Sequence, residues 1–311
     1  LEIANLDTHL DARSCKRFRY DMHVYLTSLG DDAPMTDVMT VLETGEYSPQ
    51  AKGGLDYFGD GPLDTPPIEW DPPCPGFFEH DGRQAYRADT IAAMDAAGVD
   101  RACVFNIFHP DGRRGNDATA AFVARHADRF IGFAYVSPMM SDRMVPELER
   151  AMDDLGLRAI KIYPPYTTYP LDHEAWHPVF SFAQERGLVV ISHTDGGYVS
   201  QPARLGVAAG HFPGAFFVAG HAGNIEPCRI QSIEMARTHD NFYLETCSTY
   251  RQPGVIEQLV QGAGADRVLF GSDQPLMDPR TQLGKIITAD LSDDDKRKVI
   301  GGNAKRLLGL D

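Results

Sequence analysis

Short apolar segments alternate with longer amphipathic segments from about residue 85 to the end of the chain. The short segments are rich in Val, Ile, Phe and Tyr, which is typical of parallel strands that are buried on both faces. The longer segments repeat apolar residues every three or four positions, as in 145–155 and 226–238, and this spacing indicates helices that cover a sheet. The pattern therefore predicts an α/β fold in which strands and helices alternate.

Eight segments have the length and composition of strands. They are 19–26, 101–107, 131–136, 158–163, 188–193, 215–220, 241–246 and 267–271. Eight strands joined by helices make up a (β/α)8 TIM barrel, in which the active site lies at the carboxyl ends of the strands. We therefore expect one barrel domain over residues 1–311.

Residues 27–84 interrupt this alternation, because they separate the first predicted strand from its helix. The segment is rich in Pro and Gly, contains aromatic residues such as Tyr57 and Trp70, and is too long for a plain connector. We expect an insertion after the first strand that forms a lid or a pocket wall. The alternative is a surface loop that packs on the barrel or mediates a subunit contact.

Composition narrows the classes of partner. Hydrophobic residues make up 43% of the chain and charged residues 23%, as in ordinary globular proteins. The net charge of −15 repels phosphate backbones and anionic membranes, so a small molecule is the expected partner, and nucleic acid and membranes are not. The five cysteines show no CxxC spacing, and no apolar stretch has the length of a membrane span. These features favour a reducing, cytoplasmic location.

Polar residues with metal and proton chemistry lie in, or directly after, four of the predicted strands. His23 lies in the first, His193 ends the fifth, His221 follows the sixth, and Asp273 follows the eighth. Such positions converge on one face of a barrel. Two imidazoles and one carboxylate suit zinc or a similar divalent ion and leave coordination positions open. The remaining histidine, His221, can then transfer a proton or stabilise an oxyanion.

A lysine interrupts the fourth predicted strand. Lys161 lies between Ile160 and Ile162 and should point into the barrel, where its ammonium needs an anion. We favour a structural salt bridge over contact with a substrate carboxylate, and both over a carbamate formed with carbon dioxide. Four further residues are candidates for substrate binding because of their positions: Tyr25, Trp70, His109 and Tyr163.

The order of these motifs resembles the amidohydrolase superfamily, and within it the second amidohydrolase family, which includes aminocarboxymuconate semialdehyde decarboxylase and related aromatic acid decarboxylases. Besides the lysine strand, the resemblance is carried by Asp21-Met22-His23, Ser192-His193-Thr194, Gly220-His221-Ala222-Gly223, Phe270-Gly271-Ser272-Asp273-Gln274-Pro275 and the C-terminal segment 301–310. It implies that His23, His193 and Asp273 bind the metal and that His221 acts on the substrate. It also implies that Asp273 can serve as a base and that the protein forms a dimer or a larger assembly.

The chain departs from the family pattern at one position, because the H-x-H of the first strand is His23-Val24-Tyr25 here. Tyrosine is a poor zinc ligand unless it is ionised. Our first hypothesis is an enzyme that uses zinc, or alternatively manganese, to hydrolyse or decarboxylate a small organic acid. The second is a metal-free hydrolase such as a lactonase, in which Asp273 activates water and Lys161, His193 and His221 polarise the carbonyl. The third is a non-catalytic binding protein on the same barrel.

Overall fold

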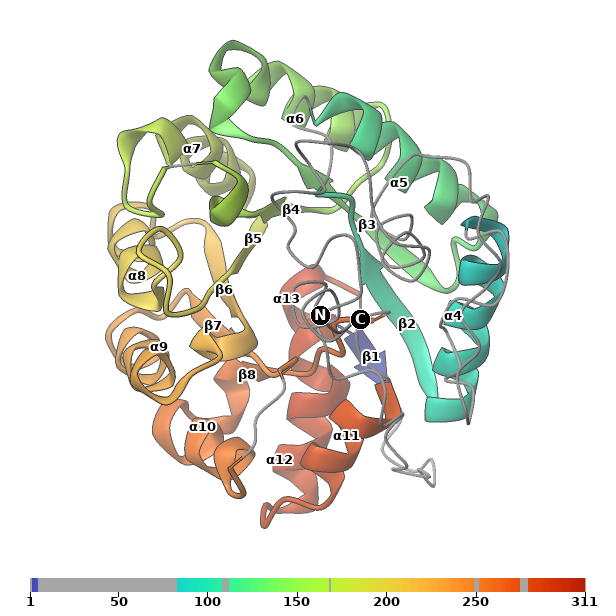
Figure 1. Cartoon of the computed structure of the whole chain (residues 1–311), viewed down its shortest axis with the longest axis vertical. Coiled ribbons are helices and arrows are strands. Elements are labelled where there is room, and N and C mark those ends of the chain that lie inside the picture. Colours follow the sequence, from blue (N-terminus) through green and yellow to red (C-terminus); the bar gives the residue numbers. More distant parts are fainter. Residues whose placement is uncertain are drawn as a thin grey trace, which may run out of the picture.

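The computed structural model describes residues 2–4, 83–107, 112–167, 169–248, 252–274 and 279–310. A curled sheet lies at the centre of these residues, with helices around its outside (Figure 1). Its strands follow the chain order: β1 (Glu2–Ala4), β2 (Val99–Val104), β3 (Phe130–Tyr135), β4 (Ala159–Ile162), β5 (Val189–His193), β6 (Phe216–Gly220), β7 (Phe242–Glu245) and β8 (Val268–Leu269). Neighbours from β2 to β8 pair in parallel, as expected for an α/β fold of this kind.

Helices follow the strands and cover the outer face of the sheet. They are α4 (Arg83–Ala97), α5 (Arg113–Arg125), α6 (Met144–Asp153), α7 (His177–Arg186), α8 (Pro202–His211), α9 (Glu226–Thr238), α10 (Val255–Ala263), α11 (Pro279–Ile287), α12 (Asp293–Arg297) and α13 (Asn303–Leu308). The predicted helix over 226–238 is confirmed with these bounds. Gly187 ends α7 with a φ of 62°, a left-handed conformation that glycine adopts without steric cost.

Seven of the eight predicted strands are confirmed. The predicted strand over 19–26 lies outside the described residues, as do residues 27–82 of the predicted insertion. The sequence analysis did not predict β1, which pairs antiparallel with β2 through Glu2 and Ala102. Three residues are too few to show a periodic pattern, so a strand of this length gives no sequence signal.

Alternate residues of the strands point to opposite faces of the sheet, and this alternation positions the polar residues. One face packs against the helices, whereas the other forms an inner cluster that includes Phe133, Ala159, Ile191 and Tyr243. Lys161, His193 and Glu245 each lie two residues after a member of this cluster, so they belong to the same inward face. The inner face is therefore apolar along the strands and becomes polar at their carboxyl ends.

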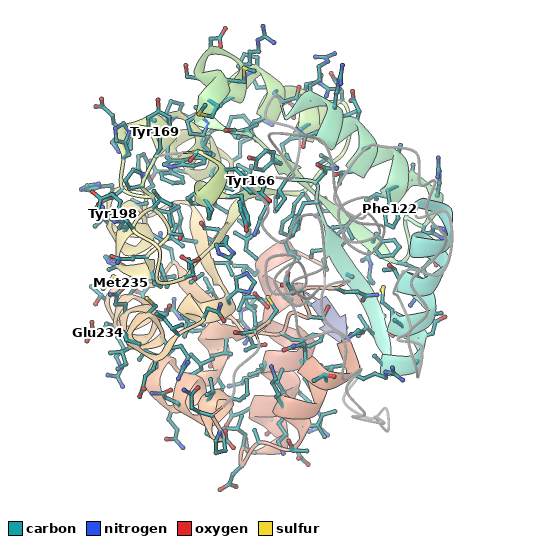
Figure 2. All side chains as sticks on the ribbon, in the orientation of Figure 1. Phe122, Tyr166, Tyr169, Tyr198, Glu234 and Met235 are labelled. Atoms are coloured by element: carbon teal, nitrogen blue, oxygen red, sulfur yellow. The ribbon has the colours of Figure 1, made fainter. Side chains whose placement is uncertain are left out.

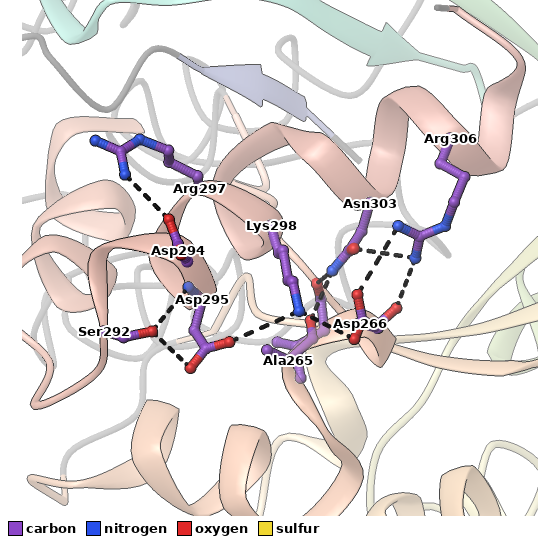
Figure 3. A network of polar contacts seen from close by, with 10 residues as sticks. Ala265, Asp266, Ser292, Asp294, Asp295, Arg297, Lys298, Asn303 and Arg306 are labelled. Carbon is purple, nitrogen blue, oxygen red and sulfur yellow. Dashed lines mark hydrogen bonds and ion pairs between the residues drawn. The ribbon is translucent and has the colours of Figure 1, made fainter.

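The C-terminal helices hold the start of β8 (Figure 3). The Asn303 side chain is fully buried and donates hydrogen bonds to the carbonyl oxygens of Ala265 (2.7 Å) and Val268 (2.8 Å). Asp266 forms ion pairs with Lys298 (3.1 Å) and Arg306 (4.0 Å) on the surface. The C-terminal motif therefore anchors the strand that leads to Asp273.

Two global predictions concern membranes and disulfides. In the described part of the chain, no helix combines the length and hydropathy that a bilayer crossing requires. Cys228 and Cys247 are free thiols. Cys15 and Cys74 lie outside the described residues.

Candidate active site

Five of the predicted site residues are described, and all five lie at the carboxyl ends of strands. Lys161 lies in β4 and Tyr163 directly after it, His193 ends β5, His221 follows β6, and Asp273 follows β8. The predicted metal ligand His23 and the predicted substrate contacts Tyr25, Trp70 and His109 lie outside the described residues. Their roles stay predictions.

A series of ring contacts connects the described site residues across the sheet. The ring centroids of Tyr163 and His193 are 4.8 Å apart, and those of His193 and His221 are 4.7 Å apart. Lys161 Nζ lies 5.8 Å from the Tyr163 ring centroid and 4.8 Å from that of Phe105. Residues at or just after the carboxyl ends of β2, β4, β5 and β6 therefore meet at one place.

The charge of Asp273 acts on two of these residues, Lys161 and Tyr163. Burial lowers the pKa of Lys161, while the negative charge of Asp273 acts in the opposite direction. Burial raises the pKa of the Tyr163 hydroxyl well above its ordinary range, and the charge of Asp273 contributes to that rise. The charge of Asp273 therefore acts on Lys161 and on Tyr163, and its role in the site stays a prediction.

His193 forms a hydrogen-bonded pair with Asp195. Its Nε2 lies 3.1 Å from Asp195 Oδ2, and Asp195 Oδ1 accepts the Gly197 N–H (2.7 Å) and the Ser200 hydroxyl. These hydrogen bonds, that of His193 first, hold the pKa of Asp195 well below its usual range, so its carboxylate is an acceptor and Nε2 must donate. Burial lowers the pKa of His193 to about 4 although Asp195 opposes that shift. A neutral imidazole with a lone pair on Nδ1 results, which is the form that binds metals.

His221 has the opposite tautomer. Its Nδ1 lies 2.7 Å from the carbonyl oxygen of Cys247, which can only accept a hydrogen bond, so Nδ1 carries a proton. Nε2 is then the ring nitrogen that can exchange a proton with a substrate. His221 also has a φ of 66°, a left-handed conformation that is unusual outside glycine.

The sequence analysis missed two buried residues beside His221. Glu245 is 1% exposed, and its carboxylate accepts hydrogen bonds from the Cys247 N–H (2.6 Å), the Cys247 thiol (2.7 Å) and the His221 N–H (3.1 Å). Burial, followed by the negative charge of Glu245, raises the pKa of the Cys247 thiol well above its usual range, so the thiol is protonated and donates. The sequence offered one signal, the alternation of side chains along a strand. Glu245 lies two residues after the inward Tyr243 and therefore also points inward.

The carboxylate of Glu245 fits only because residue 271 is a glycine. A Cβ at Gly271 would lie 1.8 Å from Glu245 Oε1, far inside van der Waals contact. In the described residues, the non-glycine residues with positive φ are His221, Ala222, Asn224 and Asp273, all after β6 or β8. Strained backbone of this kind concentrates at functional sites.

His221, Glu245 and Cys247 also form a group that could hold a metal ion, since their ligand atoms lie within 4.8 Å of one another. A nitrogen, a carboxylate and a thiolate are ligands that zinc accepts. Two distances favour hydrogen bonds instead. His221 Nδ1 is bonded to a carbonyl, and the Cys247 Sγ to Glu245 Oε2 distance is 2.7 Å, whereas two such ligands around tetrahedral zinc lie about 3.5 Å apart.

Lys161 is 5% exposed, and its surroundings differ from the salt bridge that we favoured from the sequence. Among the described residues, aromatic rings flank its ammonium, and the carboxylates of Asp273 and Glu245 act on it electrostatically without forming an ion pair. Their attraction does not offset the cost of burial, so the pKa of Lys161 stays below its ordinary value. An arriving anion would supply the close partner that this amine lacks among these residues.

Two curated proteins are similar to this chain. Gamma-resorcylate decarboxylase of Polaromonas sp. (strain JS666) is 23% identical over 280 residues, which cover 71% of this chain and 82% of that protein. The 2-amino-3-carboxymuconate-6-semialdehyde decarboxylase of Dictyostelium discoideum is 24% identical over 237 residues, which cover 63% of this chain and 66% of that protein.

Solved structures show the same fold. An uncharacterised TIM-barrel protein from Bordetella bronchiseptica has a TM-score of 0.62 and 24% identity, covering 71% of this chain and 82% of that one. A 2,6-dihydroxybenzoate decarboxylase complexed with 2,6-dihydroxybenzoate has a TM-score of 0.61 and 19% identity, covering 71% of this chain and 87% of that one. The dihydroxybenzoic acid decarboxylase from Polaromonas sp. JS666 with bound manganese and the inhibitor 2-nitroresorcinol has a TM-score of 0.57 and 19% identity, covering 71% and 85%. The curled sheet is therefore TIM-barrel-like.

The sequence model of the family described as Amidohydrolase (Amidohydro_2) matches residues 20–310, which is nearly the whole chain. The match includes every strand-end motif on which the sequence-based resemblance rested. This chain belongs to the amidohydrolase family.

Proposed function

We propose that this protein is a metal-dependent carboxy-lyase that acts on a small, planar organic acid. The observation that carries the proposal is the convergence of Lys161, His193, His221 and Asp273 at the carboxyl ends of β4, β5, β6 and β8. Both curated relatives named above are decarboxylases, which favours decarboxylation over hydrolysis for this site.

The donor atoms of the site fit a divalent ion. His193 offers the Nδ1 lone pair of a neutral imidazole, Asp273 offers a carboxylate, and His23 is the ligand proposed from the first predicted strand. A divalent ion held by these residues would supply Lewis acidity to a substrate oxygen. The relative solved with bound manganese makes manganese a candidate beside the zinc that we expected from the ligand types.

The substrate end of the site combines one cation with aromatic rings. The Lys161 ammonium can pair with a substrate carboxylate, while Phe105 and Tyr163 flank that position. Tyr166 packs on Tyr163 with a centroid distance of 4.5 Å and is 53% exposed. Figure 2 shows Tyr166 on the inner side of the ring of helices, whereas Tyr198 lies at its outer edge. Flat apolar walls around a cation suit a planar acid.

The proton steps fall to His221 and Asp273. In decarboxylation the carbon–carbon bond to the carboxylate breaks, carbon dioxide leaves, and the electron pair left on carbon takes a proton. Because the Cys247 carbonyl holds Nδ1–H, Nε2 of the neutral His221 ring is a base that first takes up a proton from solvent. The resulting imidazolium can then deliver that proton from Nε2 to the carbon. Asp273 is the second candidate for this step, because its carboxylate can take up a proton and then give it to the carbon. Its charge acts on Lys161 in β4 and on Tyr163 directly after that strand.

A metal-free hydrolase is the second candidate function, and the observation that favours it is Tyr25 at the position of a family ligand histidine. In that reaction Asp273 would activate water, and Lys161, His193 and His221 would polarise the carbonyl of a substrate such as a lactone. A non-catalytic binding protein is the third, and any turnover that disappears in Asp273→Asn would exclude it.

The test is a substrate panel run on the full chain after reconstitution with manganese, with zinc, or with chelator only. We expect carbon dioxide release from a hydroxybenzoate or a related planar acid, which is lost with chelator, restored by one metal and abolished in Asp273→Asn. Lactones and esters form the comparison set. Hydrolysis of these substrates that chelator leaves unchanged, without decarboxylation of any acid, would overturn the proposal in favour of the metal-free hydrolase.

A further inference from the structure

Glu245 connects two loops of the site and lies outside every motif that the sequence analysis singled out. Its Oε1 accepts the N–H of Cys247, two residues farther along the chain. Its Oε2 accepts both the Cys247 thiol and the N–H of His221, which belongs to the turn after β6. A single buried carboxylate therefore holds the end of β7 and the turn after β6 together.

His221 is held in an unfavourable backbone conformation by these contacts. A left-handed residue that is not glycine is disfavoured because its Cβ lies too close to the following carbonyl oxygen, so the turn needs compensating hydrogen bonds. Glu245 binds the backbone N–H of His221, and the carbonyl of Cys247 binds its ring Nδ1. Thr194 fixes the rest of the turn, since its hydroxyl donates to the Gly220 carbonyl (2.6 Å) and accepts the Gly223 N–H (3.0 Å).

We propose that Glu245 is a positioning residue that, together with Cys247, sets the backbone conformation and ring tautomer of His221 so that Nε2 faces the reacting atoms. The inference rests on the proposed function only where it assigns proton transfer to His221. Glu245 acts through His221, and Cys247 serves as a hydrogen-bond donor and carbonyl acceptor, not as a metal ligand.

The chain offers an independent way to displace the same carboxylate. A methyl group at residue 271 would overlap Glu245 Oε1, so Gly271→Ala should move the carboxylate without changing its charge. Glu245→Gln keeps the size of the side chain but replaces one acceptor oxygen by an NH2 donor. Cys247→Ser keeps a donor for Glu245 and the backbone carbonyl, so it is the conservative control.

The first readout is the ring tautomer of His221, measured by 15N–1H correlation spectra of histidine-labelled protein without metal or substrate. His221→Asn identifies the signal, and circular dichroism confirms that each variant is folded. We expect the Nδ1–H tautomer in wild type and Cys247→Ser, and a changed or mixed tautomer in Glu245→Gln and Gly271→Ala. An unchanged His221 signal in both of the latter variants would overturn the proposal, and this readout needs no active substrate.

The second readout separates positioning from metal binding and from substrate binding. With an active substrate, Glu245→Gln should lower kcat about ten- to a hundredfold, because small misplacements of a catalytic group have effects of this size, and should change KM little. Metal content should be the same in wild type, Glu245→Gln and Cys247→Ala. Loss of bound metal in Cys247→Ala would overturn the positioning role and assign His221, Glu245 and Cys247 as ligands instead.

Discussion

The Nε2 atom of His193 lies 3.1 Å from Oδ2 of Asp195, and this contact determines which ring nitrogen of His193 can bind a metal. Asp195 is itself held by the Gly197 N–H and the Ser200 hydroxyl, so its carboxylate has a fixed direction. A histidine ligand whose second nitrogen donates to a carboxylate is a common arrangement in metal sites. Asp195 follows β5 by two residues and was not among the residues that the sequence analysis selected.

Replacing Asp195 should weaken metal binding. We expect Asp195→Ala to raise the metal dissociation constant about ten- to a hundredfold, because the His193 ring loses the acceptor that orients it. Ser200→Ala removes only one of the donors to Asp195 and should have a smaller effect. Calorimetric titration of the metal-free protein with manganese or zinc measures both. Equal affinity in wild type and Asp195→Ala would show that the contact has no role in metal binding.

Replacing Lys161 should affect substrate affinity more than stability. A charge-assisted hydrogen bond contributes about 1.5–3 kcal/mol, so Lys161→Met should raise KM for an acid substrate about ten- to a hundredfold. Because burial of the amine carries a desolvation cost in the substrate-free protein, the variant should unfold at the same temperature or a higher one. Steady-state kinetics and thermal unfolding measure the two effects. A lower unfolding temperature with unchanged KM would show instead that Lys161 stabilises the fold, as in the structural salt bridge, and does not bind the substrate.

Asn303 should be important for stability although it is not one of the site residues. Asn303→Ala leaves the buried carbonyls of Ala265 and Val268 without their side-chain donor, at an expected cost of about 2–4 kcal/mol. Arg297→Gln is the matched control, because its side chain is 56% exposed and its ion pair with Asp294 (3.4 Å) should contribute about 1 kcal/mol or less. Urea unfolding gives both values. Similar losses in the two variants would contradict the role assigned to Asn303.

The lowered pKa of the buried Lys285 leads us to expect that the stability of the protein depends on pH. The ammonium donates to the carbonyl of Ser248 and to Gln282 Oε1 (2.8 Å), and burial lowers its pKa to about 8. Between pH 8 and 10.5 the unfolded chain holds a proton that the folded protein has released, so the contribution of Lys285 to the unfolding free energy rises with pH in this range.

We therefore expect the difference in unfolding free energy, wild type minus Lys285→Met, to increase from pH 8 to pH 10.5. Lys305→Met removes a charge from an exposed position and is the control for general effects of alkaline pH. A difference that stays constant or falls over this range would contradict the lowered pKa.

The sequence predicted the fold well because strands and helices of this length carry a periodic signal. Strand ends with His193, His221 and Asp273 were found for the same reason, since each follows a clear apolar run. Two kinds of feature carried no such signal. The strand β1 is too short to show a period, and the ring tautomers depend on contacts such as that between His221 and the Cys247 carbonyl, which residue types do not encode.

Glu245 and Asp195 were missed because acidic residues near strand ends are usually solvated, and only their partners show that they are structural. Glu245 is buried beside a glycine, and Asp195 folds back onto His193 through its own loop. Lys161 was found correctly as an inward residue, but its partner was predicted as a salt bridge, whereas the described residues surround it with aromatic rings. The alternation of side chains along a strand predicts which residues point inward, but it does not predict their distance from a neighbouring carboxylate.

The central claim is that His193 and Asp273 help to hold a catalytic metal, and metal content tests it most directly. Elemental analysis of protein purified without added metal or chelator should find about one equivalent of manganese or zinc in the wild type. We predict that this metal is lost in His193→Ala and in Asp273→Asn and retained in Cys247→Ala. Absence of metal from the wild type even after reconstitution, or its retention in His193→Ala, would contradict the account.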